Sequence, residues 1–293
     1  MRQFLSIMVV AFGLCSPAFA GQDLDALQAK AAQGDPNAQF NLGLMYRQGQ
    51  GVPRDDAEAV KWYRKAAAQG YPEAQSNLGL MYANGEGVAR DDVEAVKWWR
   101  KAAEQGVAQA QFNVGVMYAN GQRVPRDDAE AVKWYRKAAE QGYSAAQFNL
   151  GVMYAIGQGA PRADAEAVKW YRKAAEQRDA AAQFNLGLMY DQGKGVPRDD
   201  AEAVKWYRKA AEQGYPEAQF NLGVMYDQGQ GVPRDAAETV KWHRKAAEQG
   251  LADAQYNLGV KYYKGQGVPR DYITAYMWAS LAAAQGNENA EKS

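Results

Sequence analysis

Residues 38–73 read AQFNLGLMYRQGQGVPRDDAEAVKWYRKAAAQGYPE, and this stretch decides the fold. The pair Ala-Gln that opens it returns at a constant spacing of 36 residues, at Ala38, Ala74, Ala110, Ala146, Ala182, Ala218 and Ala254. Seven copies fill residues 38–289, with bounds 38–73, 74–109, 110–145, 146–181, 182–217, 218–253 and 254–289. Self-similarity at such a period is typical of solenoid proteins.

Each repeat contains the sequence patterns of two helices. Asp35 and Pro36 suit an N-cap and a first helical position, and Gly49 can end the first helix in left-handed backbone. Asp55 and Glu58 are spaced as a capping box for the second helix. One helix pair cannot bury its own apolar face, whereas a stack of seven pairs can. The pattern therefore predicts an all-α chain, an α-solenoid that forms one long domain.

A glycine interrupts the middle of every first helix. These glycines are Gly43, Gly79, Gly115, Gly151, Gly187, Gly223 and Gly259. A glycine inside a helix costs about 1 kcal/mol relative to alanine. A cost repeated in every repeat predicts that a neighbouring helix approaches closely at this position.

The two ends of the chain depart from the repeat. Residues 21–37 are expected to form an N-terminal capping helix that is similar to a lone second helix. In the seventh repeat, the charged residues of the solvent-facing side give way to Met277, Ser280 and Leu281. A changed terminal repeat is typical of a cap. The tail, residues 290–293, is polar.

The first twenty residues predict a cleavable secretory signal peptide, residues 1–20. Arg2 precedes an apolar run over residues 4–14, and Ala18-Phe19-Ala20 fits a cleavage site. An uncleaved anchor is the alternative, but the run is about half of the ~20 residues that a spanning helix needs. A lipid anchor at Cys15 is disfavoured because leucine, not a small residue, precedes it. We expect a periplasmic or secreted protein with no membrane span.

The composition excludes several kinds of site. Thirty-four Lys and Arg balance thirty-four Asp and Glu, which argues against nucleic-acid binding. One His and one Cys exclude a His- or Cys-rich metal site and disfavour Ser-His-Asp or Cys-His catalysis. The pair Asp55-Asp56 stands at a helix start, where acids cap amides, so we expect no metal there. The loop Gly49-Gln50-Gly51 ends a helix and does not bind a dinucleotide. The sequence predicts no cofactor.

The repeat resembles the Sel-one-like repeat family, a branch of the tetratricopeptide-type solenoids. The residues that carry the resemblance are Leu42-Gly43, Tyr46, the loop Gly49-Gln50-Gly51-Val52, Ala59, Trp62, Tyr63, Ala66, Ala67 and Gly70. The resemblance covers residues 38–286. It implies a right-handed superhelix of helix pairs with an adaptor or scaffold role, often in secreted or periplasmic proteins. A cysteine-rich branch is associated with penicillin binding, but this chain lacks the paired cysteines.

An asparagine occupies one position of every first helix and is the first candidate for binding. The row consists of Asn41, Asn77, Asn113, Asn149, Asn185, Asn221 and Asn257. A side-chain amide offers donors and acceptors to the backbone of an extended peptide. By resemblance, tetratricopeptide-type grooves use first-helix residues, including Asn, in this way. The alternative is that each Asn binds a neighbouring helix and braces the stack.

An apolar row accompanies the asparagines on the first helices. Its central members are Phe112, Phe148 and Phe184, with Val116, Val152 and Leu188 one turn further along. If this face lines the concave surface, it forms an apolar groove bordered by Asn, which suits a protein or peptide partner. The alternative is that these residues form ordinary core between repeats.

Three further features have plainer interpretations. A tryptophan row from Trp62 to Trp278 lies among alanines, which favours core over sugar binding. An arginine row that begins at Arg54 precedes the second helices, and because Asp55 follows Arg54, a structural salt bridge is favoured over an anion track. His243 takes the place of a tyrosine and is expected to be a simple substitution.

The sequence thus predicts a non-catalytic binding scaffold with no enzyme activity, whose partner is a protein or peptide. The alternative is a cell-envelope binder of small molecules or glycans, or an enzyme, related to β-lactams or the cell wall. Catalysis needs a unique constellation in one pocket, and no cluster of acids, bases or nucleophiles stands outside the repeat. A purely structural spacer is a third possibility.

Overall fold

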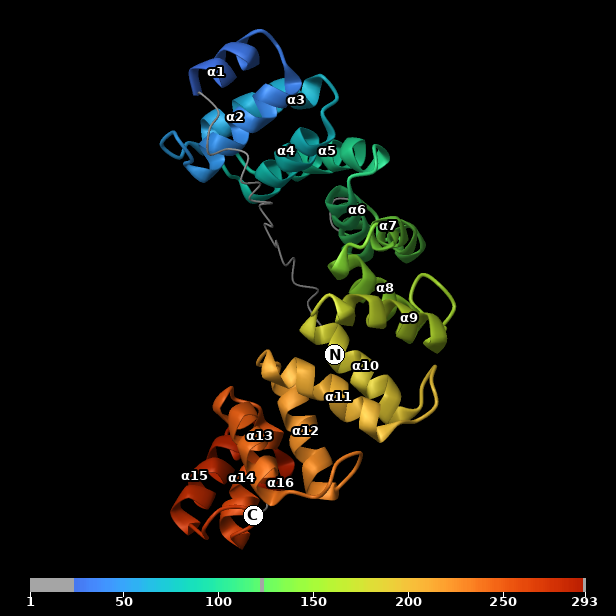
Figure 1. Ribbon diagram of the computed structural model, residues 1–293, viewed down its shortest axis with the longest axis vertical. Coiled ribbons are helices and arrows are strands. Elements are labelled where there is room, and N and C mark those ends of the chain that lie inside the picture. The colour runs from blue at the N-terminus through green and yellow to red at the C-terminus, as the bar shows by residue number, and fades with distance from the viewer. Residues whose placement is uncertain (1–23, 122–123, 292–293) are drawn as a thin grey trace. The chain divides into compact units, whose positions relative to one another are not determined.

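The computed structural model describes residues 24–121 and 124–291 (Figure 1), so the predicted signal peptide lies outside the described residues. Every regular element in these two ranges is a helix, and together they form the predicted α-solenoid. The chain divides into two compact units, with the boundary between Tyr143 and Ser144.

The helices of the two units follow one another along the chain as pairs. The first unit contains α1 (Leu24–Ala32), α2 (Pro36–Gln48), α3 (Asp56–Ala68), α4 (Pro72–Asn84), α5 (Asp92–Glu104), α6 (Ala108–Asn120) and α7 (Asp128–Glu140). The second contains α8 (Ser144–Ile156), α9 (Asp164–Glu176), α10 (Ala180–Gln192), α11 (Asp200–Glu212), α12 (Pro216–Gln228), α13 (Ala236–Glu248), α14 (Ala252–Lys264), α15 (Tyr272–Ala283) and α16 (Glu288–Glu291). The even-numbered helices from α2 to α14 are the first helices of the repeats. The odd-numbered helices from α3 to α15 are the second helices.

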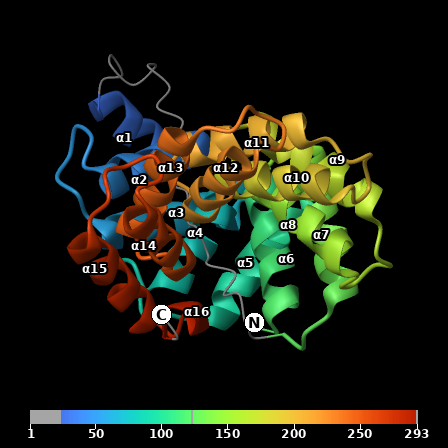
Figure 2. The same cartoon turned by 90° about the horizontal axis from the view of Figure 1, so that it is seen from below.

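Within each unit, consecutive helices pack against each other, so that α4, for example, contacts α5 of its own repeat and α3 of the repeat before it. The helices α10 and α11 run side by side in both views (Figures 1 and 2). The core between them is made of small residues from second helices and larger residues from first helices. In the first unit, for example, Ala59 and Ala66 of α3 pack with Leu78 and Met81 of α4. The apolar face of one pair is therefore completed by the next pair, as the repeat pattern predicts.

The predicted helix caps are present, with one correction. The Asp35 side chain accepts from the backbone N–H groups of Asn37 and Ala38, and Gly49 ends α2 with a φ of 68°. Asp55 caps α3, but the predicted return bond from Glu58 is wrong. The backbone N–H of Asp55 donates to the carbonyl of Tyr46, 2.9 Å away, and Glu58 binds Lys61 instead. The chain entering α3 is thus held by α2.

The glycine in each first helix is approached by an aromatic ring of the second helix. A Cβ atom at Gly43 would lie 2.7 Å from the ring of Tyr63, and one at Gly115 would lie 2.7 Å from the ring of Tyr135. The predicted close approach is confirmed, and the neighbour is a side chain. In the seventh repeat Ala279 replaces the ring, and the atom nearest to a Cβ at Gly259 is a backbone oxygen at 3.0 Å.

Two polar contacts between repeats were not predicted from the sequence. The buried Gln75 side chain donates to the carbonyl of Ala67 in the preceding repeat and accepts from Gln105 at 2.7 Å. The Arg64 guanidinium donates to the Tyr82 hydroxyl of the next repeat at 2.8 Å. Both contacts recur in the second unit, at Gln219 and at Arg208 for example. The sequence signal that could have predicted these two contacts is a glutamine and an arginine that recur at fixed positions of the repeat.

The exchange Gly115→Ala is expected to lower the melting temperature by roughly 3–10 °C, because overpacking typically costs about 1–3 kcal/mol. The added Cβ would meet the Tyr135 ring. The measurement is thermal unfolding followed by circular dichroism, with Gly115→Ala made in the native background and in Tyr135→Ala. The cost should be smaller where the ring is absent. Equal costs in both backgrounds would contradict a ring-on-glycine constraint.

Candidate protein-binding surface

The asparagine row lies on the first helices of both units, where most of its members are half-buried. The Asn41 amide donates to Asn37 at 2.7 Å, and the Asn185 amide donates to the carbonyl of Ala181 at 2.8 Å. Both bonds stay within the residue's own helix. Because an amide has two N–H donors and a carbonyl oxygen, one such bond leaves further groups to bind a partner.

Two asparagines also approach the preceding repeat. Asn77 and Arg47 lie beside the hydroxyl of Tyr63. Burial raises the pKa of Tyr63 to about 12, and these two neighbours partly offset that rise. Asn221 is placed in the same way beside Tyr207, whose pKa is also raised by burial. These contacts are of the kind expected for bracing. The asparagine row therefore lies against tyrosines of the preceding repeats and remains partly exposed.

The phenylalanine row packs into an aromatic cluster in each unit. The Phe112 ring lies 5.8 Å from the Tyr135 ring and 5.1 Å from the Tyr143 ring, measured between centroids. The Phe184 ring lies 5.8 Å and 5.2 Å from the rings of Tyr207 and Tyr215. These separations are typical of favourable aromatic pairs. The clusters hold the phenylalanines in fixed positions on the first helices.

The exposure of the apolar row differs between the units. Phe112 and Val116 are buried in the first unit. Phe148, Phe184, Val152 and Leu188 are only half-buried in the second unit. The second unit thus offers more of this row to a partner.

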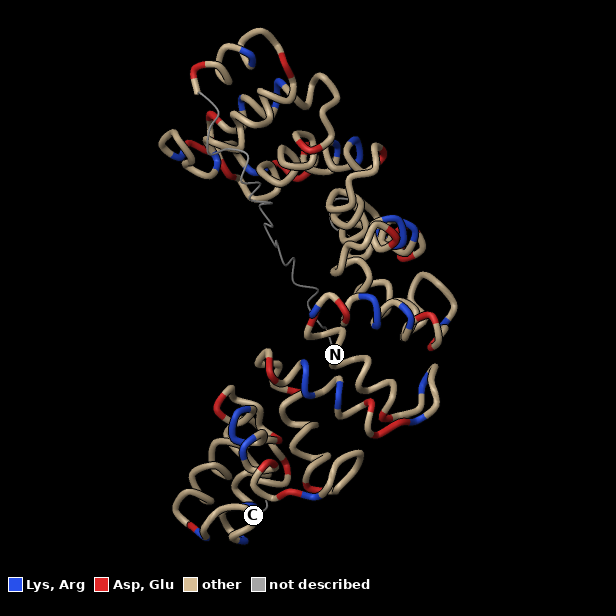
Figure 3. Tube along the Cα trace, in the orientation of Figure 1, with Lys and Arg blue, Asp and Glu red and all other residues tan. Residues whose placement is uncertain are grey.

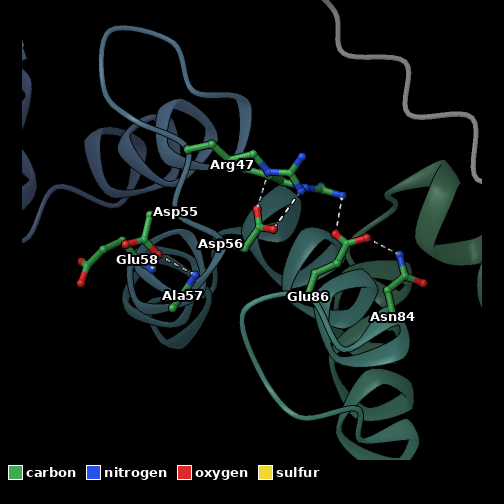
Figure 4. A network of polar contacts seen from close by, with 8 residues as sticks. Arg47, Asp55, Asp56, Ala57, Glu58, Asn84 and Glu86 are labelled. Carbon is green, nitrogen blue, oxygen red and sulfur yellow. Dashed lines mark hydrogen bonds and ion pairs between the residues drawn. The ribbon is translucent and has the colours of Figure 1, made fainter.

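Charged residues border the row at the ends of the first helices. In the first unit, Arg47 pairs with Glu86 at 3.3 Å, and Asn84 donates to the same carboxylate at 2.9 Å (Figure 4). The equivalent position in the second unit is acidic at Asp191 and Asp227. Asp191 accepts from the Tyr207 hydroxyl at 3.3 Å. The repeats therefore differ in the charge that they present beside a common amide and apolar pattern.

The arginine row is used in salt bridges, but with a different partner than expected. Arg54 pairs with Asp56 at 2.8 Å. Asp55 is instead the N-cap of α3, and its carboxylate accepts from the backbone N–H of Ala57 (Figure 4). Arg162 is followed by Ala163 and still pairs with Asp164 at 2.9 Å. These pairs are largely exposed, and exposed pairs contribute little to stability. Their consistent geometry orders the chain at the entry of α3, α5, α7, α9 and α11. In α13 and α15, Ala236 and Tyr272 stand in place of this aspartate.

The tryptophan row packs into the solenoid. Trp170, Trp206 and Trp242 are buried. A lysine one turn on covers the ring, with Nζ 4.1 Å from the ring centroid between Lys209 and Trp206. Such a cation–π contact occupies the ring face that a sugar would use. The core interpretation of this row is supported.

His243 occupies the buried tyrosine position, as predicted, and its surroundings also change. The ring stacks on Phe220 with 5.4 Å between centroids. Burial, with the nearby charge of Lys261, lowers the pKa of His243 to about 4. Lys261 stands where the other six repeats have methionine, and its buried Nζ donates to Asp227 at 2.6 Å. Sequence reasoning singled out the histidine but missed this lysine, for which the broken methionine row was the signal.

The 36-residue unit and its ring-on-glycine packing identify the repeat. The model of the Sel1 repeat matches residues 36–71, 72–107, 108–143, 144–179, 180–215, 216–251 and 252–287. The chain belongs to the Sel1 repeat family. The matched bounds begin two residues before the predicted ones and have the same period. Sel1 repeat proteins are generally scaffolds for protein interaction.

Solved Sel1 repeat structures are similar to this chain over most of its length. One is c5321, a protective antigen present in uropathogenic Escherichia coli strains, at 42% identity and a TM-score of 0.87, covering 92% of this chain and 58% of that one. Another is a Sel1 repeat protein from Oxalobacter formigenes, at 39% identity and a TM-score of 0.72, covering 94% and 81%.

A shorter match connects the chain with a named binding protein. The secretory immunoglobulin A-binding protein EsiB of Escherichia coli O6:H1 is 39% identical over 67 residues, which are 22% of this chain and 14% of EsiB. The chain therefore spans 58% of c5321 and a small part of EsiB. Among the described residues, no helix has the length and apolar character needed to cross a membrane.

His243 gives this Sel1 repeat chain a pH-dependent stability. Its folded pKa of about 4 lies below the ordinary value of 6.5, so the unfolded chain binds the proton more readily. Stability is complete above pH 6.5 and is lost as the pH falls toward 4, by up to about 3 kcal/mol. His243→Tyr restores the residue of the other repeats and should remove this loss. The measurement is urea unfolding of both proteins at neutral pH and near the folded pKa. A stability difference that does not change with pH would contradict this account.

Proposed function

We propose that this Sel1 repeat chain is a non-catalytic periplasmic or secreted scaffold that binds a protein or peptide through its first helices. The observation that supports it best is the partly exposed amide and apolar row of the second unit, at Asn185, Phe148, Phe184 and Leu188. The bond from Asn185 to its own helix and the aromatic clusters fix these side chains before a partner binds. A fixed surface loses little conformational entropy on binding.

A protein partner fits this surface better than a glycan. Interfaces between proteins combine apolar anchors with amide hydrogen bonds, which is what the row supplies. Sugar binding by the tryptophans would require displacement of covering lysines such as Lys65, whose Nζ lies 4.0 Å from the centroid of the Trp62 ring. The name of EsiB, an immunoglobulin A-binding protein, also favours a protein ligand for this kind of repeat.

The location of the scaffold rests on its first residues. The pattern of Arg2, the apolar run over 4–14 and Ala18-Phe19-Ala20 favours export and cleavage after Ala20. An exported scaffold would meet its partner in the periplasm or outside the cell.

The change of Asn113, Asn149 and Asn185 together to Ala is expected to weaken partner capture at least tenfold while the helical content is kept. The half-buried amides of Asn113 and Asn185 are the ones that can reach a partner, since Asn149 is buried. Each lost hydrogen bond is worth about 0.5–1.5 kcal/mol. The measurement is cross-linking in intact cells, capture of the tagged chain, and quantification of the bound proteins by mass spectrometry. The captured partner is then purified, and its affinity for each variant is measured by calorimetry.

The matched control changes Glu140, Glu176 and Glu212 to Ala, in the same three repeats. These exposed residues lie on second helices, and the first repeat already has Ala68 at their position. The control should bind as the unchanged chain does. Equal capture by both triple variants would remove the first-helix surface from the proposal. Unfolding of the Asn variant would assign the row to bracing, and binding of muropeptides or β-lactams without any protein partner would favour the envelope alternative.

A further inference from the structure

The last second helix, α15, has an apolar side that no described residue covers. Its solvent-facing side chains are Tyr272, Ile273, Tyr276, Met277 and Leu281, with exposed fractions of 58%, 84%, 77%, 45% and 44%. We call these five residues the α15 strip. The Tyr263 ring, at the end of α14, lies edge-on to Tyr272 at 5.5 Å and extends the strip. The exposed patch thus belongs to the second unit alone.

The strip lies on the side of α15 opposite to its packed side. Ala275 and Ala282 are buried, and Trp278 and Ala279 are half-buried. At 100° per residue these four share one face of the helix, while the strip residues share the other. The start of the helix is well ordered, because Asp271 accepts from the backbone N–H of Ile273 at 3.0 Å. The exposed Ser280 lies among the strip residues, so the outer face is apolar apart from this one hydroxyl. A helix that is apolar around most of its circumference is normally buried.

The positions of Ile273, Met277 and Leu281 are exposed in the interior repeats too, so a following repeat would not cover them. Tyr276 differs, because it stands where each interior repeat has a buried valine, such as Val60, which packs with Leu78 of the next repeat. In the first repeat the positions of Tyr272, Met277 and Leu281 hold Asp56, Lys61 and Lys65. These charged residues recur in most interior repeats, where Asp56 binds Arg54 and Lys61 binds Glu58. The seventh repeat has thus exchanged charged for apolar side chains at these three positions.

The strip carries no charge, and this limits the kind of surface that can cover it. The helix α15 contains no Lys, Arg, Asp or Glu, and it is tan throughout in Figure 3. A surface without charges has no preference for an acidic or basic partner, but it is complementary to itself. In a two-fold dimer the same patch is used by both copies. An identical strip therefore meets the chemical requirement without any repulsion.

The area of the strip is also sufficient for self-association. With roughly 200 Å² for each large side chain, the strip exposes on the order of 600 Å² in one copy. Two copies would bury on the order of 1,200 Å², which is the lower limit for specific interfaces. The twelve residues of α15 are too few to cross a bilayer, which needs about 20.

We propose that the α15 strip is the interface of a two-fold dimer, in which α15 of one copy packs against α15 of a second copy. Tyr276 and Ile273, the most exposed members, form its centre, and Tyr272 with Tyr263 forms one edge. The first-helix surface plays no part in this contact, so dimerisation and partner binding are separate properties.

The test is sedimentation equilibrium of the purified chain from about 1 to about 200 µM, a range that spans the affinity expected for an interface of this size. The mass should rise toward that of two chains. The double variant Ile273→Lys with Tyr276→Lys changes only exposed positions and should raise the dimer Kd at least tenfold, because it buries like charges. Circular dichroism checks that this variant has the helical content of the unchanged chain.

The matched control is Val93→Lys. Val93 holds the same repeat position as Ile273 and is 71% exposed, but it lies on α5 among charged neighbours. Its Kd should equal that of the unchanged chain. A chain that remains monomeric over the whole range, or a control that dissociates as much as the double variant, would overturn the proposal. Strip-dependent binding of a monomer to phosphatidylglycerol vesicles would overturn it in favour of a lipid surface.

Discussion

The contact between an aromatic ring and a bare glycine is the constraint on which the first six repeats depend. Because Gly43 has no Cβ, the ring of Tyr63 lies directly against the backbone of α2. The ring then supports Phe40, at 5.9 Å, and its hydroxyl lies beside Asn77 of the next repeat. One buried side chain therefore sets the spacing of two helices and contacts two residues of the first-helix rows. The fold and the candidate surface are consequences of the same packing.

Much of this architecture could be predicted because the repeat fixes which residues share a helix face. The caps at Asp35 and Asp55 and the close approach at Gly43 follow from spacing and from the chemistry of single residues. Two details could not be predicted, because they depend on how the chain enters α3. The backbone N–H of Asp55 donates to the carbonyl of Tyr46, and Arg54 forms its ion pair with Asp56 and not with Asp55.

The candidate site could be located but not described from the sequence. The first-helix rows were predicted, yet the same apolar position is buried at Val116 and half-exposed at Leu188. Such a difference depends on the side chains of the adjacent repeats. The electrostatic influence of Lys261 on His243 has the same origin, since residues 18 positions apart come near each other only when consecutive helices pack. A row in the sequence gives the face of a helix, whereas its exposure comes from the stack.

The departures from the repeat show which positions are free to acquire a separate role. Lysine can replace a core methionine at residue 261 because its Nζ donates to the carboxylate of Asp227, in the preceding repeat, at 2.6 Å. A buried charge requires such a partner, so the lysine at 261 depends on the aspartate of the preceding repeat. The reverse does not hold, because Asp191 is followed by methionine at residue 225. The α15 strip has no compensating partner of this kind in the described residues. Ile273, Met277 and Leu281 stand at positions that are exposed in the interior repeats too, so their apolar character is best explained by a surface that contacts another chain.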